Sequence, residues 1–160
     1  MSVNKQNGFS AIEMMVVLAV IAILALIAVP SGVERIVKEH VLAAIPLADI
    51  AKEPIAAKWK LLKALPLNNE AAGLPQPDKV VSNFIRSLEV QDGVIHMTFG
   101  NKANPKLMGK MLTIRPAVIE DSQIVPIAWV CGNAKAPNNM LLIGINKTNI
   151  EERYLPFNCK

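Results

Sequence analysis

An unbroken run of apolar residues, 14–29, constrains this 160-residue chain more than any other feature of its sequence. Extended back to Phe9, the segment 9–29 is about 31 Å long as an α-helix, because each residue adds about 1.5 Å. That length matches the roughly 30 Å hydrocarbon core of a bilayer. The chain therefore has room for one membrane-sized helix and one small domain.

A secretory signal peptide, removed whole, is the alternative interpretation of this segment. Three features argue against it: the run is longer than a typical signal-peptide core, it contains no Ala-x-Ala cleavage site, and only Lys5 is basic in the polar stretch before it. We therefore expect residues 9–30 to remain in the working protein as a helix.

Apolar residues continue at helical spacing beyond Pro30, with charged residues between them, as far as Leu62. The pattern predicts one long helix of about 50 residues, apolar over 9–30 and amphipathic over 31–65. Proline lacks an amide donor and crowds the carbonyl four residues before it. We therefore expect bends or local breaks at Pro30, Pro46 and Pro54.

After Leu65 the sequence becomes rich in turn residues and then in short strand candidates. Strands are predicted over 93–99, 110–119 and 124–131, with a weaker candidate over 141–145. Together they predict a small antiparallel meander in a headpiece, defined as residues 66–160, with the amphipathic helix covering one face. The fold class is α+β.

Two cysteines, Cys131 and Cys159, lie near the C-terminus. An even pair behind a membrane or export segment indicates a disulfide formed in an oxidising compartment. A metal site needs more ligands, and the only histidines are His40 and His96. A bridge would close a loop of 27 residues, which typically stabilises a fold by about 2–4 kcal/mol.

The stretch Gly8-Phe9-Ser10-Ala11-Ile12-Glu13, followed by an apolar run ending at Pro30, resembles the N-terminus of type IV pilins. In that family a prepilin peptidase removes a short leader ending in glycine and methylates the new N-terminal amine. The resemblance implies a leader of residues 1–8, cleavage between Gly8 and Phe9, and N-methylation of Phe9. It also implies a role in filament assembly for Glu13, the fifth mature residue, and a helix kink at Pro30.

The C-terminal sequence carries a second resemblance. Trp129-Val-Cys131 and the stretch from Tyr154 to Cys159 are similar to the disulfide-bounded region of type IVa pilins, the subclass with short leaders and Phe as first mature residue. The sequence between about residue 60 and this region is not diagnostic. The resemblance implies the pilin fold, in which the apolar half of the helix is exposed or spans the membrane.

Glu13 would be unfavourable in a bilayer, because inserting a charged carboxylate costs roughly 2.5–3.5 kcal/mol of free energy on insertion scales. Cleavage would give Phe9 an amine that is cationic near neutral pH. Phe9 and Glu13 are four residues apart and so share a helix face, and the helix dipole favours an anion in the first turn. Pairing of the carboxylate with such an amine, in the same or a neighbouring copy, would offset the cost and fix the axial register between subunits. The alternative is a carboxylate at headgroup level with no specific role.

The resemblance implies a structural subunit of a type IV pilus. The prepilin would cross the inner membrane once with its headpiece in the periplasm, and the processed protein would polymerise with copies of itself into a surface fibre for adhesion, twitching motility or DNA uptake. The implied partners are the prepilin peptidase, an assembly platform with motor ATPases, and a secretin. Two alternatives stay open: a minor, DNA-binding competence pilin, or a type II secretion pseudopilin, against which the cysteine pair argues.

No constellation in the sequence indicates an enzyme. Ser/His/Asp, Cys/His and paired-carboxylate arrangements are lacking, as is a phosphate-binding loop, so we expect no cofactor and no metal. One basic group stands out, because no acid occurs between Gly93 and Ala117. It predicts a patch for DNA or another anion or, since no aromatic residues interleave with the basic ones, a solvated loop. Its members are Lys102, Lys106, Lys110 and Arg115.

Overall fold

The computed structural model describes residues 9–160, apart from the side chains of 27–31. Two compact units divide the chain. We call the residues up to Arg35 the N-terminal unit and Ile36–Lys160 the C-terminal unit. The predicted leader, including Gly8, lies outside the described residues.

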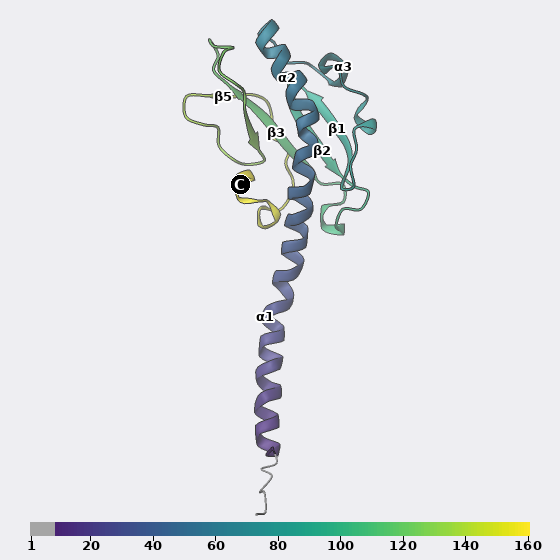
Figure 1. Cartoon of the computed structure of the whole chain (residues 1–160), viewed down its shortest axis with the longest axis vertical. Coiled ribbons are helices and arrows are strands. Elements are labelled where there is room, and N and C mark those ends of the chain that lie inside the picture. The colour runs from purple at the N-terminus through teal and green to yellow at the C-terminus, as the bar shows by residue number, and fades with distance from the viewer. Residues whose placement is uncertain (1–8) are drawn as a thin grey trace, which may run out of the picture. The chain divides into compact units, whose positions relative to one another are not determined.

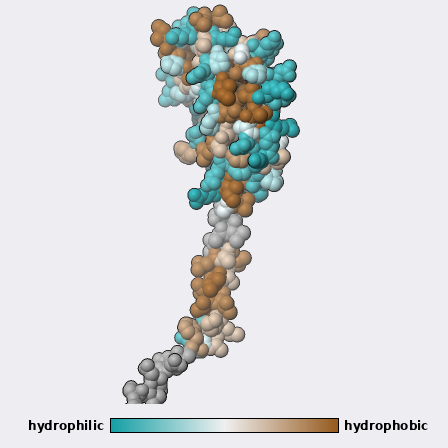
Figure 2. Space-filling model, turned by 45° about the vertical axis from the view of Figure 1, so that its right-hand side comes forward, coloured by the Kyte–Doolittle hydropathy of each residue, from teal (hydrophilic) through white to brown (hydrophobic). Residues whose placement is uncertain are grey.

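The first helix, α1, runs over Ala11–Ala44 and therefore belongs to both units. Its backbone is helical through Pro30, and the kink expected there stays a prediction. Among the described residues, no helix combines the length and the apolar character of a membrane span. Figure 2 shows hydrophobic residues over the visible surface of the N-terminal unit, where side chains such as Met15 and Leu18 are exposed.

The predicted long helix is not continuous beyond Ala44. A 3₁₀ turn, η1 (Ile45–Ala48), separates α1 from α2 (Asp49–Leu62), and Pro46 lies at the start of that turn. The expected break at Pro46 is therefore confirmed. Pro54, in contrast, lies inside α2 without ending it, and the helix stops where Lys63 adopts a left-handed conformation with φ of 53°.

Five antiparallel strands form the sheet (Figure 1): β1 (Ile85–Gln91), β2 (Val94–Phe99), β3 (Met111–Val118), β4 (Ala128–Cys131) and β5 (Leu141–Leu142). The strand order is β1-β2-β3-β4, and β5 pairs with the C-terminal end of β3, at Ala117 and Val118. This is the predicted meander, and the α+β class is confirmed. The strand predicted over 124–131 was wrong in its first half, because residues 124–127 pair with no strand.

Strand β1 was not predicted from the sequence. Its hairpin with β2 turns at Asp92-Gly93, where φ is 50° and 78°. Positive φ at both central residues is the requirement of a two-residue type I′ turn, and Asp-Gly is one of the dipeptides that satisfy it best. The turn signal was therefore present in the sequence.

The connection between α2 and β1 contains a short helix, α3 (Asn69–Ala72), and a 3₁₀ turn, η2 (Pro77–Lys79). The buried Asn69 amide takes the place of a strand on the outer edge of β1. Its Nδ2 donates to the Leu88 carbonyl at 2.9 Å, and its Oδ1 accepts from the Val90 N–H at 2.6 Å. These bonds protect an edge that would otherwise expose unpaired backbone groups.

One apolar core lies between the helices and the sheet in the C-terminal unit, where α2 runs across one face of the sheet (Figure 1). The helical residues in this core are three or four positions apart, so they form a single stripe even across η1. They are Val37, Val41, Ala44, Ala48, Ala51 and Ile55. Buried sheet residues such as Leu88, Ile95 and Met97 complete the core.

Candidate functional site

The N-terminal unit holds the predicted assembly residue, Glu13, at the start of α1. The Glu13 Oε2 accepts from the Ser10 N–H at 2.8 Å, while the Ser10 Oγ accepts from the Ile12 N–H at 3.3 Å. This is the reciprocal arrangement of a capping box, which satisfies backbone donors that the first helical turn leaves free. The sequence signal Ser-x-x-Glu was available at Ser10 to Glu13, but the capping role was not predicted.

Phe9 lies before the helix, which begins at Ala11. The shared helix face expected for Phe9 and Glu13 is therefore not formed in the uncut chain, where the Phe9 nitrogen is still part of a peptide bond. The Glu13 side chain is exposed and accepts a hydrogen bond from the Ser10 backbone N–H. It is an anion at the edge of an apolar surface, accessible to a group from outside.

That apolar surface is a second feature of the N-terminal unit. Phe9 and most of the large apolar residues as far as Leu26 are exposed in the single chain. Exposed apolar patches of this kind mark surfaces that contact a membrane or another protein. The surface and the lone carboxylate together form the candidate assembly site.

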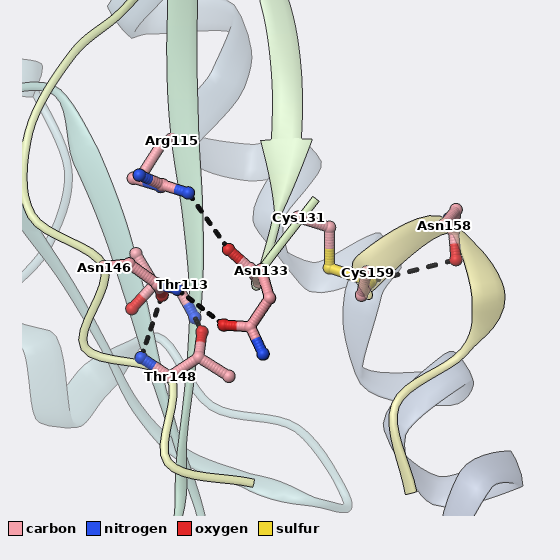
Figure 3. The surroundings of a disulfide bond; sticks show 9 residues. Thr113, Arg115, Cys131, Asn133, Asn146, Thr148, Asn158 and Cys159 are labelled. Carbon is pink, nitrogen blue, oxygen red and sulfur yellow. Dashed lines mark hydrogen bonds between the residues drawn. A yellow bond between two sulfur atoms is a disulfide. The ribbon is translucent and has the colours of Figure 1, made fainter. Parts of the chain in front are cut away.

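The predicted disulfide is present. Cys131 ends β4 and Cys159 lies in the last 3₁₀ turn, η5 (Phe157–Cys159), with an S–S distance of 2.02 Å. The Asn133 N–H also donates to the Cys159 carbonyl at 2.9 Å. Figure 3 shows how the bridge holds the C-terminal turn against the end of β4.

Side chains attach the segment before this turn to β3. The Asn149 Oδ1 accepts from the Met111 N–H at 2.7 Å, and the Thr148 Oγ1 accepts from the Thr113 N–H at 3.0 Å. Asn146 joins the same arrangement, since its Nδ2 donates to the Asn133 Oδ1 at 2.8 Å (Figure 3). The loop that the disulfide closes is thus bonded to β3 through Thr148 and Asn149.

His96 is a buried polar group of β2 that the assembly site does not use. Its Nδ1 lies 3.0 Å from the Thr113 Oγ1, and its side chain is only 3% exposed. Burial, aided by the positive charge of Lys147, lowers the pKa of His96 from 6.5 to about 4. The imidazole is therefore neutral at physiological pH, and it lies beside residues 144–147 and not in the apolar core.

The four residues of the predicted basic patch lie in two parts of the chain, three in the loop between β2 and β3 and one in β3. Lys102 and Lys106 are exposed in the loop between β2 and β3, and Lys110 is half-buried at its end. The Lys106 Nζ donates to the Tyr154 hydroxyl at 2.8 Å and lies 5.4 Å from the centre of that ring.

Arg115 differs from the three lysines because it belongs to β3. Its Nη2 donates to the Gly132 carbonyl at 3.2 Å (Figure 3), and burial lowers the pKa of its guanidinium. This arginine supports the turn after β4. Within the described residues, no three His, Cys, Asp or Glu side chains are grouped so as to hold a metal ion.

Comparison with known proteins gives two family matches. A model described as pilin, a bacterial filament protein, matches residues 38–160, and a model of the prokaryotic N-terminal methylation motif matches residues 3–29. A type IV major pilin protein of Neisseria gonorrhoeae is 29% identical, covering 97% of this chain and 87% of its own. A fimbrial protein of Neisseria meningitidis serogroup B is 28% identical over 97% of this chain and 94% of its own. Fimbrial protein Q of Moraxella bovis is 28% identical over 98% and 99%, respectively.

Proposed function

Because this chain belongs to the pilin family of bacterial filament proteins and is a structural subunit of a type IV pilus, we propose that it is the major subunit of that pilus. One observation carries the proposal: the N-terminal unit exposes a long apolar helical surface with the carboxylate of Glu13 at its N-terminal edge. A surface of this kind lets many copies bundle their helices and exclude water. A structural role of this type requires no cofactor.

Processing would create a cationic amine on Phe9 that can pair with the Glu13 carboxylate. We propose that the prepilin peptidase cuts between Gly8 and Phe9 and then methylates the Phe9 amine. The match to the methylation motif over residues 3–29 spans this position and supports the proposal. The new amine is cationic near neutral pH, and an apolar filament core favours its pairing with the Glu13 carboxylate of a neighbouring copy.

Before assembly, residues 9–30 hold the prepilin in the inner membrane as a single span, with the headpiece in the periplasm. The Cys131–Cys159 disulfide fits such an oxidising compartment. An assembly platform with motor ATPases then draws the subunit into the growing fibre, which leaves through a secretin to the cell surface. There the fibre serves adhesion, twitching motility or DNA uptake.

The second candidate function is that of a minor pilin that binds DNA. Lys102 and Lys106 are exposed, and no Asp or Glu lies near them in the sequence. Phosphate contacts by these lysines would weaken as salt rises. A gel-shift assay with the full chain in detergent tests this role. Unchanged DNA binding in a variant with Lys102 and Lys106 replaced by Gln would exclude the patch. The pseudopilin alternative is less well supported, because the disulfide region resembles that of pilins.

The mass of sheared surface fibres tests the main proposal. We expect their dominant protein to consist of residues 9–160, heavier by one methyl group and lighter by the two hydrogens of the disulfide. If this protein were absent from the fibres or only a trace component, the major-subunit proposal would be wrong.

Replacement of the carboxylate tests its role in assembly. Glu13→Ala should leave the amount of protein in the membrane unchanged and reduce the yield of fibres to little or none. Ser10→Ala is the matched control, because it removes the capping hydroxyl bonded to Ile12 but keeps the carboxylate. Normal fibre yield from Glu13→Ala, or equal loss in both variants, would contradict the pairing.

A further inference from the structure

Both tryptophans of the chain line one open cavity in the C-terminal unit. Trp59 contributes from α2 and Trp129 from β4, and the third wall is the segment 123–127 that leads into β4. The cavity measures about 450 Å³, within the range of typical ligand sites. Nothing in the assembly site described above uses it.

The cavity lies beside an open part of the sheet. β4 is the last strand in the strand order, and the C-terminal turn is linked to its Cys131 end by the disulfide. Ile124, in the segment that leads into β4, is 93% exposed although it forms part of the apolar wall. The cavity is therefore accessible to a segment from another molecule.

Two N–H donors in the cavity wall lack an acceptor within the described residues: Trp59 Nε1 and Gln123 Nε2. Buried donors in folded proteins are almost always paired, so an unpaired group indicates a partner outside the chain. Both atoms are buried in the single chain, so the indole and the amide must rotate before they can donate to a docked carbonyl. Grooves lined by aromatic rings of this kind recognise proline-rich segments in the polyproline II conformation.

The same chain has a proline-containing segment at residues 74–77, Leu-Pro-Gln-Pro, in which Leu74 packs against the core and Pro77 begins η2. Gln76 has φ of −55° and ψ of 151°, near the polyproline II values, and both Pro75 and Gln76 are exposed. The Pro75 carbonyl accepts from Asn69 Nδ2 and the Gln76 carbonyl from the Lys79 N–H. Each carbonyl retains a second lone pair for another donor.

The charges around the two surfaces are complementary. Glu70 and Glu89 border the proline segment. The cavity is bordered by Lys52 and Lys60, with Glu53 as its only acid. Lys52 also pairs with Asp49 at 2.8 Å, so Lys60 is the lysine more available to the acids. Such complementarity favours the encounter of the two surfaces and fixes their orientation.

The proline segment lies on the β1 side of the sheet and the cavity on the β4 side, at opposite ends of the strand order. A segment cannot reach the cavity of its own chain in this arrangement. A contact between two different surfaces of identical chains repeats from copy to copy, and it builds a helical filament where the rotation between copies does not close a ring.

We propose that residues 74–77 of one copy dock in the tryptophan-lined cavity of another copy in the pilus. The contact rests on the polymerisation proposed above and gives the headpieces a specific register, in addition to the one that Glu13 supplies at the helices. Its essential residues are Trp59, Trp129 and Gln123 in the cavity and Pro75 and Pro77 in the segment.

Tryptophan fluorescence provides a direct test, because both tryptophans report from this cavity. The full chain, dispersed in detergent as single copies, is titrated with a peptide of residues 72–79. We expect a saturable blue shift, no shift with a control peptide in which both prolines are alanine, and several-fold weaker binding by the Gln123→Ala variant. A missing shift, an equal shift with the control peptide, or a shift caused by an oligosaccharide and not by the peptide would overturn the proposal. Since the assay needs no fibres, its failure is distinguishable from a failure of polymerisation.

Cross-linking within fibres tests the same contact in the assembly. In the double variant Gln76→Cys, Ile124→Cys, a mild added oxidant should join two thiols of neighbouring copies as a disulfide, with both hydrogens passing to the oxidant. Non-reducing gels should then show a ladder of multimers, whereas each single variant gives none. The matched control replaces Ile124→Cys by Ile145→Cys, at a residue that is 74% exposed and lines a separate cavity. A ladder from the control alone, or no ladder from fibres that do form, would contradict the docking.

Discussion

The N-terminal and C-terminal units differ in the exposure of their apolar side chains. In the N-terminal unit, exposed apolar side chains surround α1, and no internal core is available to them among the described residues. In the C-terminal unit, the same kinds of residue form one stripe that is buried against the sheet. Both stretches are helical, so helix formation alone does not decide where a side chain is buried.

The difference shows where each unit obtains its stability. The C-terminal unit is held by its own core, its disulfide and its hydrogen-bonded loops. The apolar surface of the N-terminal unit lowers its free energy only when something outside the chain covers it, such as lipid or the helices of other copies. Substitutions should therefore affect folding in one unit and assembly in the other.

A pair of isoleucines on the helices gives the largest expected contrast. Ile55 is 0% exposed in the C-terminal unit, and Ile21 is 56% exposed in the N-terminal unit. Ile55→Ala should lower the free energy of unfolding by about 2–5 kcal/mol, since it leaves a cavity in the core. Ile21→Ala should change it by less than about 0.5 kcal/mol. Denaturant titration of the full chain in detergent, followed by tryptophan fluorescence, measures both.

Equal losses from the two substitutions would break the contrast between the units. The fluorescence signal belongs to the C-terminal unit, because Trp59 and Trp129 both lie there. A complementary result is expected in cells. Ile21→Ala should affect fibre yield more than it affects the stability of the single chain.

The buried His96 predicts a pH dependence confined to the C-terminal unit. Its pKa is lowered from 6.5 to about 4 in the folded chain, so between these values the unfolded chain binds the proton and the folded chain does not. The contribution of the neutral His96 to the free energy of unfolding is therefore fully present above about pH 6.5. It falls by about 3 kcal/mol as the pH drops to about 4. Denaturant titrations across this range should show the slope.

Two variants identify the source of that slope. His96→Gln should remove it, whatever its effect on stability at neutral pH. Lys147→Met should reduce it only in part, because burial is the larger cause of the lowered pKa and the Lys147 charge is the smaller. A slope that persists unchanged in His96→Gln would assign it to other groups.

Asn69 predicts a smaller loss at the edge of the sheet. Asn69→Ala leaves the Leu88 carbonyl and the Val90 N–H without their side-chain partner, which should cost about 1–3 kcal/mol. Asn68→Ala is the matched neighbour, since the Asn68 Oδ1 caps α3 at an exposed position through the Ala71 N–H. It should cost about 1 kcal/mol. If Asn68→Ala proved the more damaging of the two, the protective role of Asn69 at β1 would be excluded.

Local patterns made most of the fold predictable from sequence. The apolar periodicity identified the stretch that forms α1 and α2, and the short apolar runs on either side of a turn-rich loop identified β2 and β3. Strand β1 was missed because a register shift between Ile85 and Ser87 interrupts the alternation of its buried residues. Residues 124–127 were taken for a strand because they are apolar, but they form a cavity wall, and sequence does not distinguish the two uses.

Apart from the disulfide, the side-chain contacts between distant residues were not predicted from the sequence. The basic patch appeared continuous in sequence, yet Lys106 bonds Tyr154, 48 residues away, and Arg115 supports the turn at Gly132. Both groupings depend on which segments the sheet brings together. The capping box at Ser10 and Glu13, in contrast, is local, and its signal could have been read from the sequence.

The smallest expected effect concerns that capping box, in the N-terminal unit. Ser10→Ala removes the hydroxyl that accepts from the Ile12 N–H, which weakens the first helical turn by about 1 kcal/mol. Amide hydrogen exchange of the full chain in detergent should then be roughly fivefold faster at residues 11–13. The denaturation midpoint of the C-terminal unit should not move, because the helix start contributes nothing to its core. A shift of that midpoint would mean that the two units share stability, and the separation between folding and assembly would no longer hold.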